Sequence, residues 1–364
     1  MKNLLITGGA GFIGSNFVHY WINRHDDQVT VLDALTYAGN RKSIEEHEDR
    51  EDFSFVHGDI CDEKLVNEII DAGNIDTVIH FAAESHVDRS IHGPDPFINT
   101  NIVGTHCLLK AARDCWSRKG MLSTGRFHHV STDEVYGSLE PEEAAFEESR
   151  AYDPRSPYSA SKAASDHLMR AYHHTYGLNI TISNCSNNYG PYHFPEKLIP
   201  LAILNLLFGK SIPVYGDGAN IRDWLYVEDH CRAIELILRD GKSGQTYNIG
   251  GRAEMTNMQV VELICRTVDD LFNDNPALKT RFPQSPPARG ESSTSMITFV
   301  KDRPGHDRRY AMNIDKISSE LGFLPGENFS SGIRKTVLWY IDNEQWWSPI
   351  LNFEYADWIK KQYG

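Results

Sequence analysis

A glycine-rich turn near the N-terminus most restricts what this 364-residue chain can fold into. The apolar run Asn3–Thr7 precedes the turn, and an amphipathic stretch that continues through Trp21 follows it. Between them, Gly9, Gly11 and Gly14 fit the pattern G-x-G-x-x-G. Glycines at these positions allow a tight turn and let the backbone approach a pyrophosphate held at the helix N-terminus. The order of strand, glycine turn and helix therefore predicts the first unit of a dinucleotide-binding fold.

An acidic residue at the end of the next expected strand narrows the choice of dinucleotide. The run Val29–Asp33 has the pattern of a strand, and Asp33 lies 19 residues after Gly14. A carboxylate at that position accepts hydrogen bonds from the adenosine ribose, and its charge would repel a 2′-phosphate. The sequence therefore favours NAD over NADP. A structural glycine turn followed by a capping aspartate is the alternative interpretation.

Strands and helices continue to alternate beyond this unit. Further strands are expected at 53–56, 77–81, 126–131 and 179–185, with a long helix at 97–116. This alternation predicts an α/β protein with a doubly wound, Rossmann-type parallel sheet. Past residue 188 the alternation loosens, which indicates a smaller, mixed α/β substrate lobe. We expect two interleaved domains: residues 1–188 plus about 226–251 bind the cofactor, and 189–225 plus about 252–364 bind the substrate.

Composition excludes several classes of function. The net charge of −14 argues against a nucleic-acid or anionic-membrane surface. No apolar run is long enough to span a bilayer, and the first residues lead directly into a strand rather than forming a secretory signal. The six cysteines are scattered, with no C-x-x-C pair. We therefore expect a reduced, cytoplasmic protein without a metal site or a disulfide framework.

Three polar side chains follow the strand that ends near Ser131. Thr132, Asp133 and Glu134 place a hydroxyl and two carboxyl groups at the carboxyl end of a strand, where the chemistry of open parallel sheets takes place. Adjacent carboxyl groups are suited to act as a paired acid and base. The alternative is a purely local role, because such runs also form turns and helix caps.

A tyrosine and a lysine form the second group of candidate catalytic residues. Tyr158 and Lys162 follow a proline that is typical of a helix start, and their spacing of four places them on one helix face. We expect the Lys162 ammonium to lower the pKa of Tyr158 from about 10, which makes the tyrosine a usable base. A surface tyrosine-lysine pair is the alternative.

These motifs resemble the extended short-chain dehydrogenase/reductase family of nucleotide-sugar enzymes, and within it the dTDP-glucose 4,6-dehydratases, from Met1 to about Gln345. The resemblance rests on the glycine turn, LTYAGN at 35–40, AAESHVDRS at 82–90, STDEVYG at 131–137, YSASK at 158–162, NCSNNYGPYHFPEKLIP at 184–200, RDW at 222–224 and DRPGHD at 302–307. The Thr-Asp-Glu triplet points to the dehydratases, because sugar epimerases of the family carry no such acid pair. The Pro/Ser/Arg-rich segment 275–295 looks longer than the usual connection, and we expect it to be an exposed loop.

The resemblance implies conversion of dTDP-glucose to a 4-keto-6-deoxy sugar nucleotide, a deoxysugar precursor, with tightly held NAD. Tyr158, poised by Lys162, would take the proton of the 4-hydroxyl while Thr132 hydrogen-bonds that oxygen and hydride leaves carbon 4. Glu134 would then remove the proton on carbon 5, and a protonated Asp133 would release the 6-hydroxyl as water, before hydride returns to carbon 6. The alternatives are a UDP- or GDP-sugar dehydratase, a nucleotide-sugar 4-epimerase and an inactive nucleotide-binding regulator.

The same resemblance implies sets of binding residues. Those expected to bind NAD are Gly8, Gly11, Phe12, Ile13, Gly14, Asp33, Leu35, Thr36, Asp59, Ile60, Phe81, Ala82, Ala83, Ser85, Thr100, Tyr158, Lys162 and Asn188. Those expected to bind the substrate are Ser85, His86, Thr132, Asp133, Glu134, Asn187, Lys197, Leu198, Pro213, Tyr215, Arg222, Asn257, Arg303 and His306. The family also implies a homodimer through a four-helix interface built from residues 97–116 and 156–176.

Overall fold

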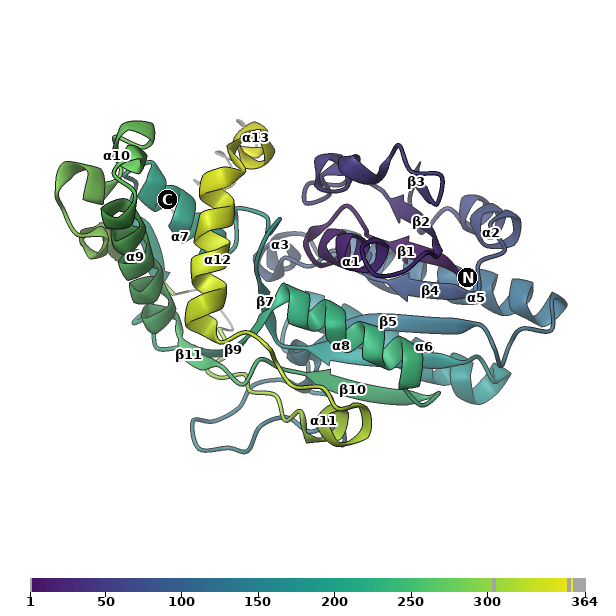
Figure 1. The fold of residues 1–364 in the computed structure, drawn as a ribbon. Helices are drawn as coiled ribbons and strands as arrows, with labels where there is room; N and C mark the ends of the chain where they lie inside the picture. Colours follow the sequence, from purple (N-terminus) through teal and green to yellow (C-terminus); the bar gives the residue numbers. More distant parts are fainter. Residues whose placement is uncertain (1, 303–305, 352–354, 356–364) are drawn as a thin grey trace.

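The computed structural model describes residues 2–302, 306–351 and 355, and its largest element is a seven-stranded sheet (Figure 1). All neighbouring strands pair in parallel, in the order β10-β6-β5-β4-β1-β2-β3. The strands are β1 (Asn3–Thr7), β2 (Gln28–Asp33), β3 (Phe53–His57), β4 (Thr77–His80), β5 (Arg126–Thr132), β6 (Ile180–Cys185) and β10 (Gln245–Ile249). The predicted doubly wound sheet is therefore confirmed.

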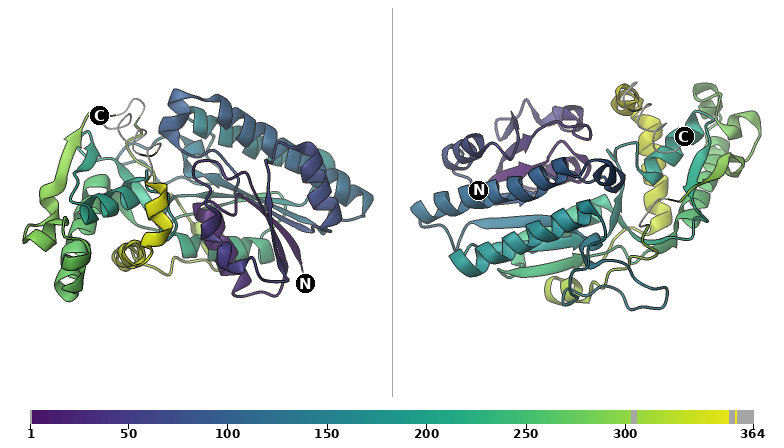
Figure 2. Two further views of the ribbon diagram at one scale, coloured as in Figure 1. Left: turned by 90° about the horizontal axis from the view of Figure 1, so that it is seen from above. Right: turned by 180° about the vertical axis from the view of Figure 1, so that it is seen from behind.

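Helices cover both faces of this sheet (Figure 2). One face carries α1 (Phe12–Ile22), α8 (Val227–Asp240) and α11 (Asp315–Leu321), and the other carries α2 (Glu63–Ala72), α5 (Thr105–Arg118) and α6 (Pro157–Tyr176). Successive strand residues point to opposite faces. Leu4 and Ile6 accordingly pack into the core under α1 and α8, whereas Leu5 packs into the core under α2 and α5. The central strands are therefore buried on both sides, as is typical of a parallel sheet, whereas the edge strand β3 is partly exposed.

Two helical segments bear directly on the site. Ser156 and Ser159 form a capping box at the start of α6, Pro157 occupies its first position, and Gly177 ends the helix in the left-handed conformation. The long helix expected at 97–116 is not uniform, because a π-helical stretch at Ile98–Gly104 separates α4 (Asp95–Phe97) from α5. Gly104 faces Ile60, which leaves no room for a larger side chain. A short helix, α3 (Val87–His92), precedes α4.

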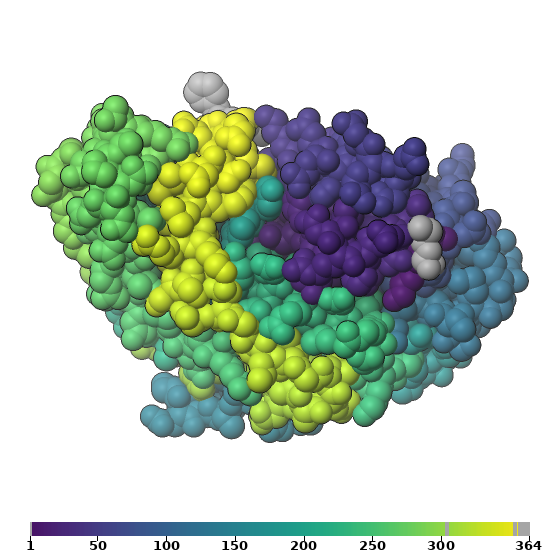
Figure 3. Space-filling view, viewed as in Figure 1, coloured from purple at the N-terminus to yellow at the C-terminus, as the bar shows by residue number. Residues whose placement is uncertain are grey.

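The second lobe is smaller and mixed α/β, as predicted. Its helices are α7 (Leu198–Leu207), α9 (Asn257–Asp274), α10 (Ala277–Arg281), α12 (Phe329–Asp342) and α13 (Glu344–Trp347). One small sheet has the order β11 (Glu254–Thr256), β9 (Ile221–Tyr226), β7 (Asn187–Tyr189), and a second pairs β12 (Ile297–Val300) with β8 (Ile212–Tyr215). Ile203, Ile264 and Ile333 belong to a separate apolar core here. In Figure 3 the yellow surface of α12 runs beside the boundary between the lobes.

The segment 275–295 is largely exposed, as predicted, but the prediction that it is a loop is wrong. The segment contains α10 and 3₁₀ turns at Pro286–Arg289 and Ser293–Met296, and it folds back onto α9. Ser293 is fully buried, and its backbone N–H donates to the carboxylate of Asp269 on α9 at 3.1 Å. Pro286 and Pro287 are buried in the first of these turns. None of the helices in the described part of the chain is both long and apolar enough to cross a lipid bilayer.

Candidate active site

A cavity of about 450 Å³ lies where the carboxyl ends of the parallel strands face the second lobe. The glycine turn and the ends of β4 and β5 line one side of it, and residues of the second lobe such as Tyr215 and Arg222 line the other. Every predicted cofactor or substrate residue that the structure describes lines this cavity, with the exception of Leu35. Arg303 lies outside the described residues. The topology thus brings together residues that are distant in sequence.

The glycine turn has the close packing expected of a dinucleotide site. Gly8 has a φ of +72°, and a Cβ atom there would lie 2.5 Å from the backbone N of Ala82. A Cβ atom at Gly14 would lie 2.1 Å from the carbonyl oxygen of Gly8. Helix α1 begins at Gly11 with no side chain capping its first amide groups. These features fit a pyrophosphate, because they leave space and backbone donors at the positive end of the helix.

Asp33 shapes the adenosine end of the cavity. One carboxylate oxygen accepts the backbone N–H of Ala10 at 2.9 Å, and the other accepts that of Leu35 at 2.8 Å. Burial raises the pKa of Asp33, although both hydrogen bonds act against this shift. Leu35 has a φ of 49°, which directs its amide toward Asp33. The carboxylate is thus fixed where a ribose would sit, and the contribution of Leu35 is to hold it.

The Thr132–Asp133–Glu134 run both caps a turn and places two carboxyl groups at the cavity. Thr132 ends β5 and caps a 3₁₀ turn, because its hydroxyl accepts the backbone N–H of Glu134 at 3.3 Å. Asp133 is buried, and one of its oxygens has no hydrogen-bond partner within the protein. Burial, together with the neighbouring charge of Glu134, raises the pKa of Asp133 well above its usual range. This shift favours the protonated form of Asp133, which lines the cavity.

Tyr158 does not have the lowered pKa that the Lys162 ammonium was expected to cause. Burial is the largest effect, and the charge of Glu134 adds to it, so the pKa of Tyr158 is raised well above 10. A hydrogen bond with Thr132 acts in the opposite direction. Lys162 instead donates to the carbonyl oxygen of Val130 at 2.8 Å. Spacing places the two residues on one helix face, but the sequence does not reveal how strongly that face is desolvated.

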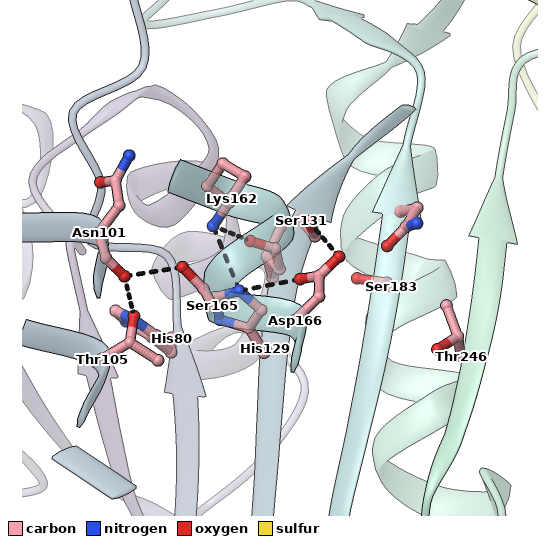
Figure 4. Close-up of polar contacts among 12 residues, drawn as sticks. His80, Asn101, Thr105, His129, Ser131, Lys162, Ser165, Asp166, Ser183 and Thr246 are labelled. Atoms are coloured by element: carbon pink, nitrogen blue, oxygen red, sulfur yellow. Dashed lines mark hydrogen bonds and ion pairs between the residues drawn. The ribbon is translucent and has the colours of Figure 1, made fainter. Parts of the chain in front are cut away.

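A buried polar network surrounds Lys162 (Figure 4). Its Nζ lies 3.4 Å from Nε2 of His129, which lies 3.3 Å from Asp166 Oδ1. The other Asp166 oxygen accepts the hydroxyls of Ser131 at 3.0 Å and Tyr152 at 2.8 Å. Burial lowers the pKa of Lys162 to about 8, and the charge of Asp166 opposes this shift. Asp166 is therefore the carboxylate that favours the charged form of the buried lysine.

Asp166 and Glu196 are the residues that sequence reasoning missed. Asp166 continues the spacing of Tyr158 and Lys162 by four more residues, which was a readable signal for a third residue on the same face of α6. Glu196 lines the cavity and is buried against Arg89, whose Nη2 lies 3.0 Å from it. Its place next to Lys197 was visible in the sequence, but the long-range pairing with Arg89 was not.

The second lobe supplies the cationic side of the cavity. Arg222 is buried on β9, donates to the carbonyl oxygen of Asp307 at 3.0 Å and stacks over the Tyr310 ring at 4.3 Å. The Nζ of Lys197 lies 3.4 Å from the carbonyl oxygen of Ser85. A guanidinium and an ammonium in one cavity suit an anionic ligand such as a diphosphate.

Comparisons with known proteins agree with this geometry. A family model described as GDP-mannose 4,6 dehydratase matches residues 5–336. The "dTDP-glucose 4,6-dehydratase" of Shigella flexneri is 53% identical over 99% of this chain and 98% of its own length. The "dTDP-glucose 4,6-dehydratase 1" of Escherichia coli K12 is 52% identical with the same coverage.

Solved structures give the same picture. The dTDP-glucose 4,6-dehydratase of Streptomyces venezuelae, determined with NAD and TYD bound, has a TM-score of 0.84 and 45% identity, covering 96% of this chain and 100% of that one. A UDP-glucose 4-epimerase from Thermotoga maritima is more distant, with a TM-score of 0.78 and 26% identity over 94% of this chain and 99% of its own. The chain described here therefore belongs to the dTDP-glucose 4,6-dehydratase family.

Proposed function

We propose that this chain is an NAD-dependent lyase that converts dTDP-glucose to dTDP-4-keto-6-deoxyglucose with loss of water. The observation that carries the proposal is the buried Asp133 next to Glu134, in one cavity with the glycine turn and Tyr158. The names of relatives at 52–53% identity and the NAD in the Streptomyces structure support it. The product is a precursor for deoxysugar biosynthesis of the rhamnose type.

The cofactor fits the first lobe. The turn from Gly8 to Gly14 would hold its pyrophosphate, and Asp33 would hold its adenosine ribose. When bound, NAD⁺ supplies a hydride acceptor and a positively charged ring. Because Asp33 would repel a 2′-phosphate, NAD rather than NADP is the proposed cofactor.

Tyr158 and Thr132 serve the oxidation at carbon 4. Tyr158 takes the proton of the 4-hydroxyl, and Thr132 hydrogen-bonds to the same oxygen and holds it in place. Since protein groups alone keep Tyr158 protonated at pH 7, positive charge next to its oxygen must favour the phenolate during turnover. We assign that charge to Lys162, which lies one turn further along α6 and is held by its hydrogen bond to the Val130 carbonyl oxygen.

Asp133 and Glu134 perform the elimination. Once carbon 4 is a ketone, the proton on carbon 5 is acidic, and the Glu134 carboxylate removes it. Asp133 donates its proton to the leaving 6-hydroxyl, which departs as water. The raised pKa of Asp133 provides the acid form that this step needs. The 4-epimerase alternative gives no role to this acid pair.

The substrate would lie across the second lobe. We assign the diphosphate and nucleoside to Asn187, Lys197 and Arg222, and the glucose to Ser85 and His86. Arg303, outside the described residues, remains assigned to the nucleotide by resemblance.

The direct test is turnover of dTDP-glucose, UDP-glucose and GDP-glucose by the full chain, read by mass spectrometry. We expect a product lighter by one water from dTDP-glucose, and much slower turnover of the other two. Faster turnover of the GDP sugar would instead follow the description of the matching family model and overturn the nucleotide assignment. A product of unchanged mass at the 4-epimer would overturn the reaction itself.

The charge on Lys162 gives a prediction about pH. Lys162 is cationic below a pKa of about 8, and the Asp166 charge raises that pKa. Asp166→Asn should therefore move the alkaline limb of the kcat/KM profile to lower pH, by about 1 to 3 units. Ser131→Ala, which removes a hydrogen bond to the same carboxylate and no charge, should leave the limb near its original place. If Asp166→Asn lowers kcat/KM at every pH but leaves the alkaline limb in place, Asp166 contributes only to packing.

We also propose the two-domain division 1–188 plus about 226–251 and 189–225 plus about 252–364. The pairing of β10 with β6 in the main sheet supports the return of 226–251 to the first domain. The separate core of the second lobe supports the other boundary.

A homodimer through residues 97–116 and 156–176 and their symmetry mates is the proposed assembly. Ile98 and Val103 are each 44% exposed, and Tyr176 at the end of α6 is 45% exposed. Val103→Asp should convert the dimer to a monomer in light scattering after gel filtration, because it places a charge in an apolar contact. Leu324→Asp, at a leucine elsewhere that is 52% exposed, is the matched control and should remain dimeric. A dimeric Val103→Asp protein would remove these helices from the interface.

The proposed location is the cytoplasm. All six cysteines are free, and five of them are buried, which suits a reducing compartment.

A further inference from the structure

Three side chains with metal-binding atoms meet at a place that the catalytic cavity does not include. His19 comes from α1, whereas Glu46 and His47 come from the 3₁₀ turn Glu45–His47 between β2 and β3. They are the one group of three such side chains within ligating reach of each other among the described residues. None of them lines the catalytic cavity, and the mechanism above does not use them.

The spacing of the three atoms matches a tetrahedral metal. The Nδ1 of His19 lies 2.7 Å from His47 Nε2 and 3.2 Å from Glu46 Oε1, and the latter two atoms are 3.7 Å apart. Zinc binds nitrogen and oxygen ligands at about 2.0–2.1 Å, so the ligand atoms of a tetrahedral site lie about 3.3 Å from one another. The three observed distances bracket that value. An ion just above their plane would reach all three atoms with small side-chain adjustments.

A hydrogen bond at Nε2 of His19 orients the other ring nitrogen, Nδ1, toward His47 and Glu46. His19 Nε2 lies 2.7 Å from the carbonyl oxygen of Ser43, which can only accept, so Nε2 carries the proton. Neutral His19 then presents the Nδ1 lone pair to His47 and Glu46. A metal-bound histidine usually donates a hydrogen bond from its other ring nitrogen, often to a backbone carbonyl oxygen.

A cation would favour the contact between His19 and Glu46. The Nδ1 lone pair and a carboxylate oxygen are both acceptors, and they repel each other at 3.2 Å unless a cation lies between them. A proton on His47 Nε2 would satisfy the two imidazoles but not Glu46. A divalent ion satisfies all three atoms at once.

We propose that His19, Glu46 and His47 bind Zn²⁺ or a divalent ion of the same class, with a water in the fourth position. The donor set of two imidazoles and one carboxylate is suited to zinc. Glu46 is 68% exposed, so the ion can enter from solvent. The site would join α1, the helix that follows the glycine turn, to the segment between β2 and β3. Trp346 of α13 donates to the Ser43 hydroxyl at 3.0 Å, so the second lobe contacts the same segment.

The test uses the full chain after treatment with a chelator. Competition of Zn²⁺ against a chromogenic chelator should give one ion per chain, and Co²⁺ should give a visible absorption band typical of four-coordination. Glu46→Gln, which changes an exposed residue and leaves the fold intact, should weaken Zn²⁺ binding at least about 10-fold, and His47→Gln at least about 100-fold. His25→Gln is the matched control. His25 also pairs with a glutamate, Glu235, at 3.0 Å, but this pair does not belong to a group of three metal-binding side chains among the described residues.

A second readout does not depend on activity. Zn²⁺ should raise the melting temperature of the chain and of His25→Gln but not of Glu46→Gln, because an ion that binds only the folded state stabilises it. Absence of stoichiometric binding to the unaltered chain would overturn the proposal. Binding that Glu46→Gln and His47→Gln leave unchanged would equally overturn it.

Discussion

The Asp133→Asn/Glu134→Gln double variant should oxidise dTDP-glucose at carbon 4 and then stop. We expect formation of the 4-keto-6-deoxy product to fall by at least about 100-fold, because one substitution removes the acid and the other removes the base. Tyr158, Thr132 and Lys162 remain, so the first step has all of its groups. The reduced cofactor should therefore accumulate, visible by its absorbance, while mass spectrometry shows almost no loss of water.

A matched control separates this effect from a change in net charge. Asp49→Asn/Glu51→Gln makes the same two chemical changes at exposed positions and should keep full activity. Near-normal product formation by the Asp133/Glu134 variant would remove these carboxyl groups from the elimination. Loss of both the oxidation and the product would indicate instead that the pair is needed to bind the sugar.

Tyr158→Phe should block the reaction one step earlier. The substitution removes one oxygen from a buried ring, and with it the group that takes the 4-hydroxyl proton. We expect turnover to fall by about 100- to 10,000-fold, with no accumulation of reduced cofactor after dTDP-glucose is added. The two variants thus fail at different points, which a single absorbance trace distinguishes.

The control for this variant lies on the same helix. Tyr172 lies near the C-terminal end of α6, where it hydrogen-bonds His106 at 3.1 Å, and Tyr172→Phe should retain activity. Cofactor content should be measured for each protein, since a Tyr158→Phe chain that had simply lost NAD would say nothing of proton transfer. Normal turnover by a loaded Tyr158→Phe chain would require another base.

Local patterns were sufficient to predict the main sheet and most of the cavity. The glycine turn, Asp33 and the Thr132–Glu134 run each follow a strand, and a parallel sheet places all strand carboxyl ends along one edge. Which residues lie along this edge can be predicted from the sequence, because it depends only on the order of strands and helices.

The remaining features depend on distant contacts. Asp166 meets His129, Glu196 meets Arg89, and His19 meets His47 only after the chain has folded. The pKa of Tyr158 shifts in the opposite direction to the one expected, because burial and the charge of Glu134 both raise it. The prediction of a loop at 275–295 is wrong for a similar reason. The buried Ser293 donates a hydrogen bond to Asp269 on α9, and composition does not reveal this distant contact.

The position of β10 bears on how the chain is made. In the finished sheet Gln245 pairs with Thr181, so the last strand joins β6 only after the chain has passed through β7, α7, β8, β9 and α8. During synthesis on the ribosome, β6 would therefore leave the exit tunnel with one edge unpaired for as long as that excursion takes. An unpaired edge can recruit a strand from another chain. The interval between translation of β6 and of β10 is thus the period in which a nascent chain of this architecture is most exposed to aggregation and most in need of a chaperone.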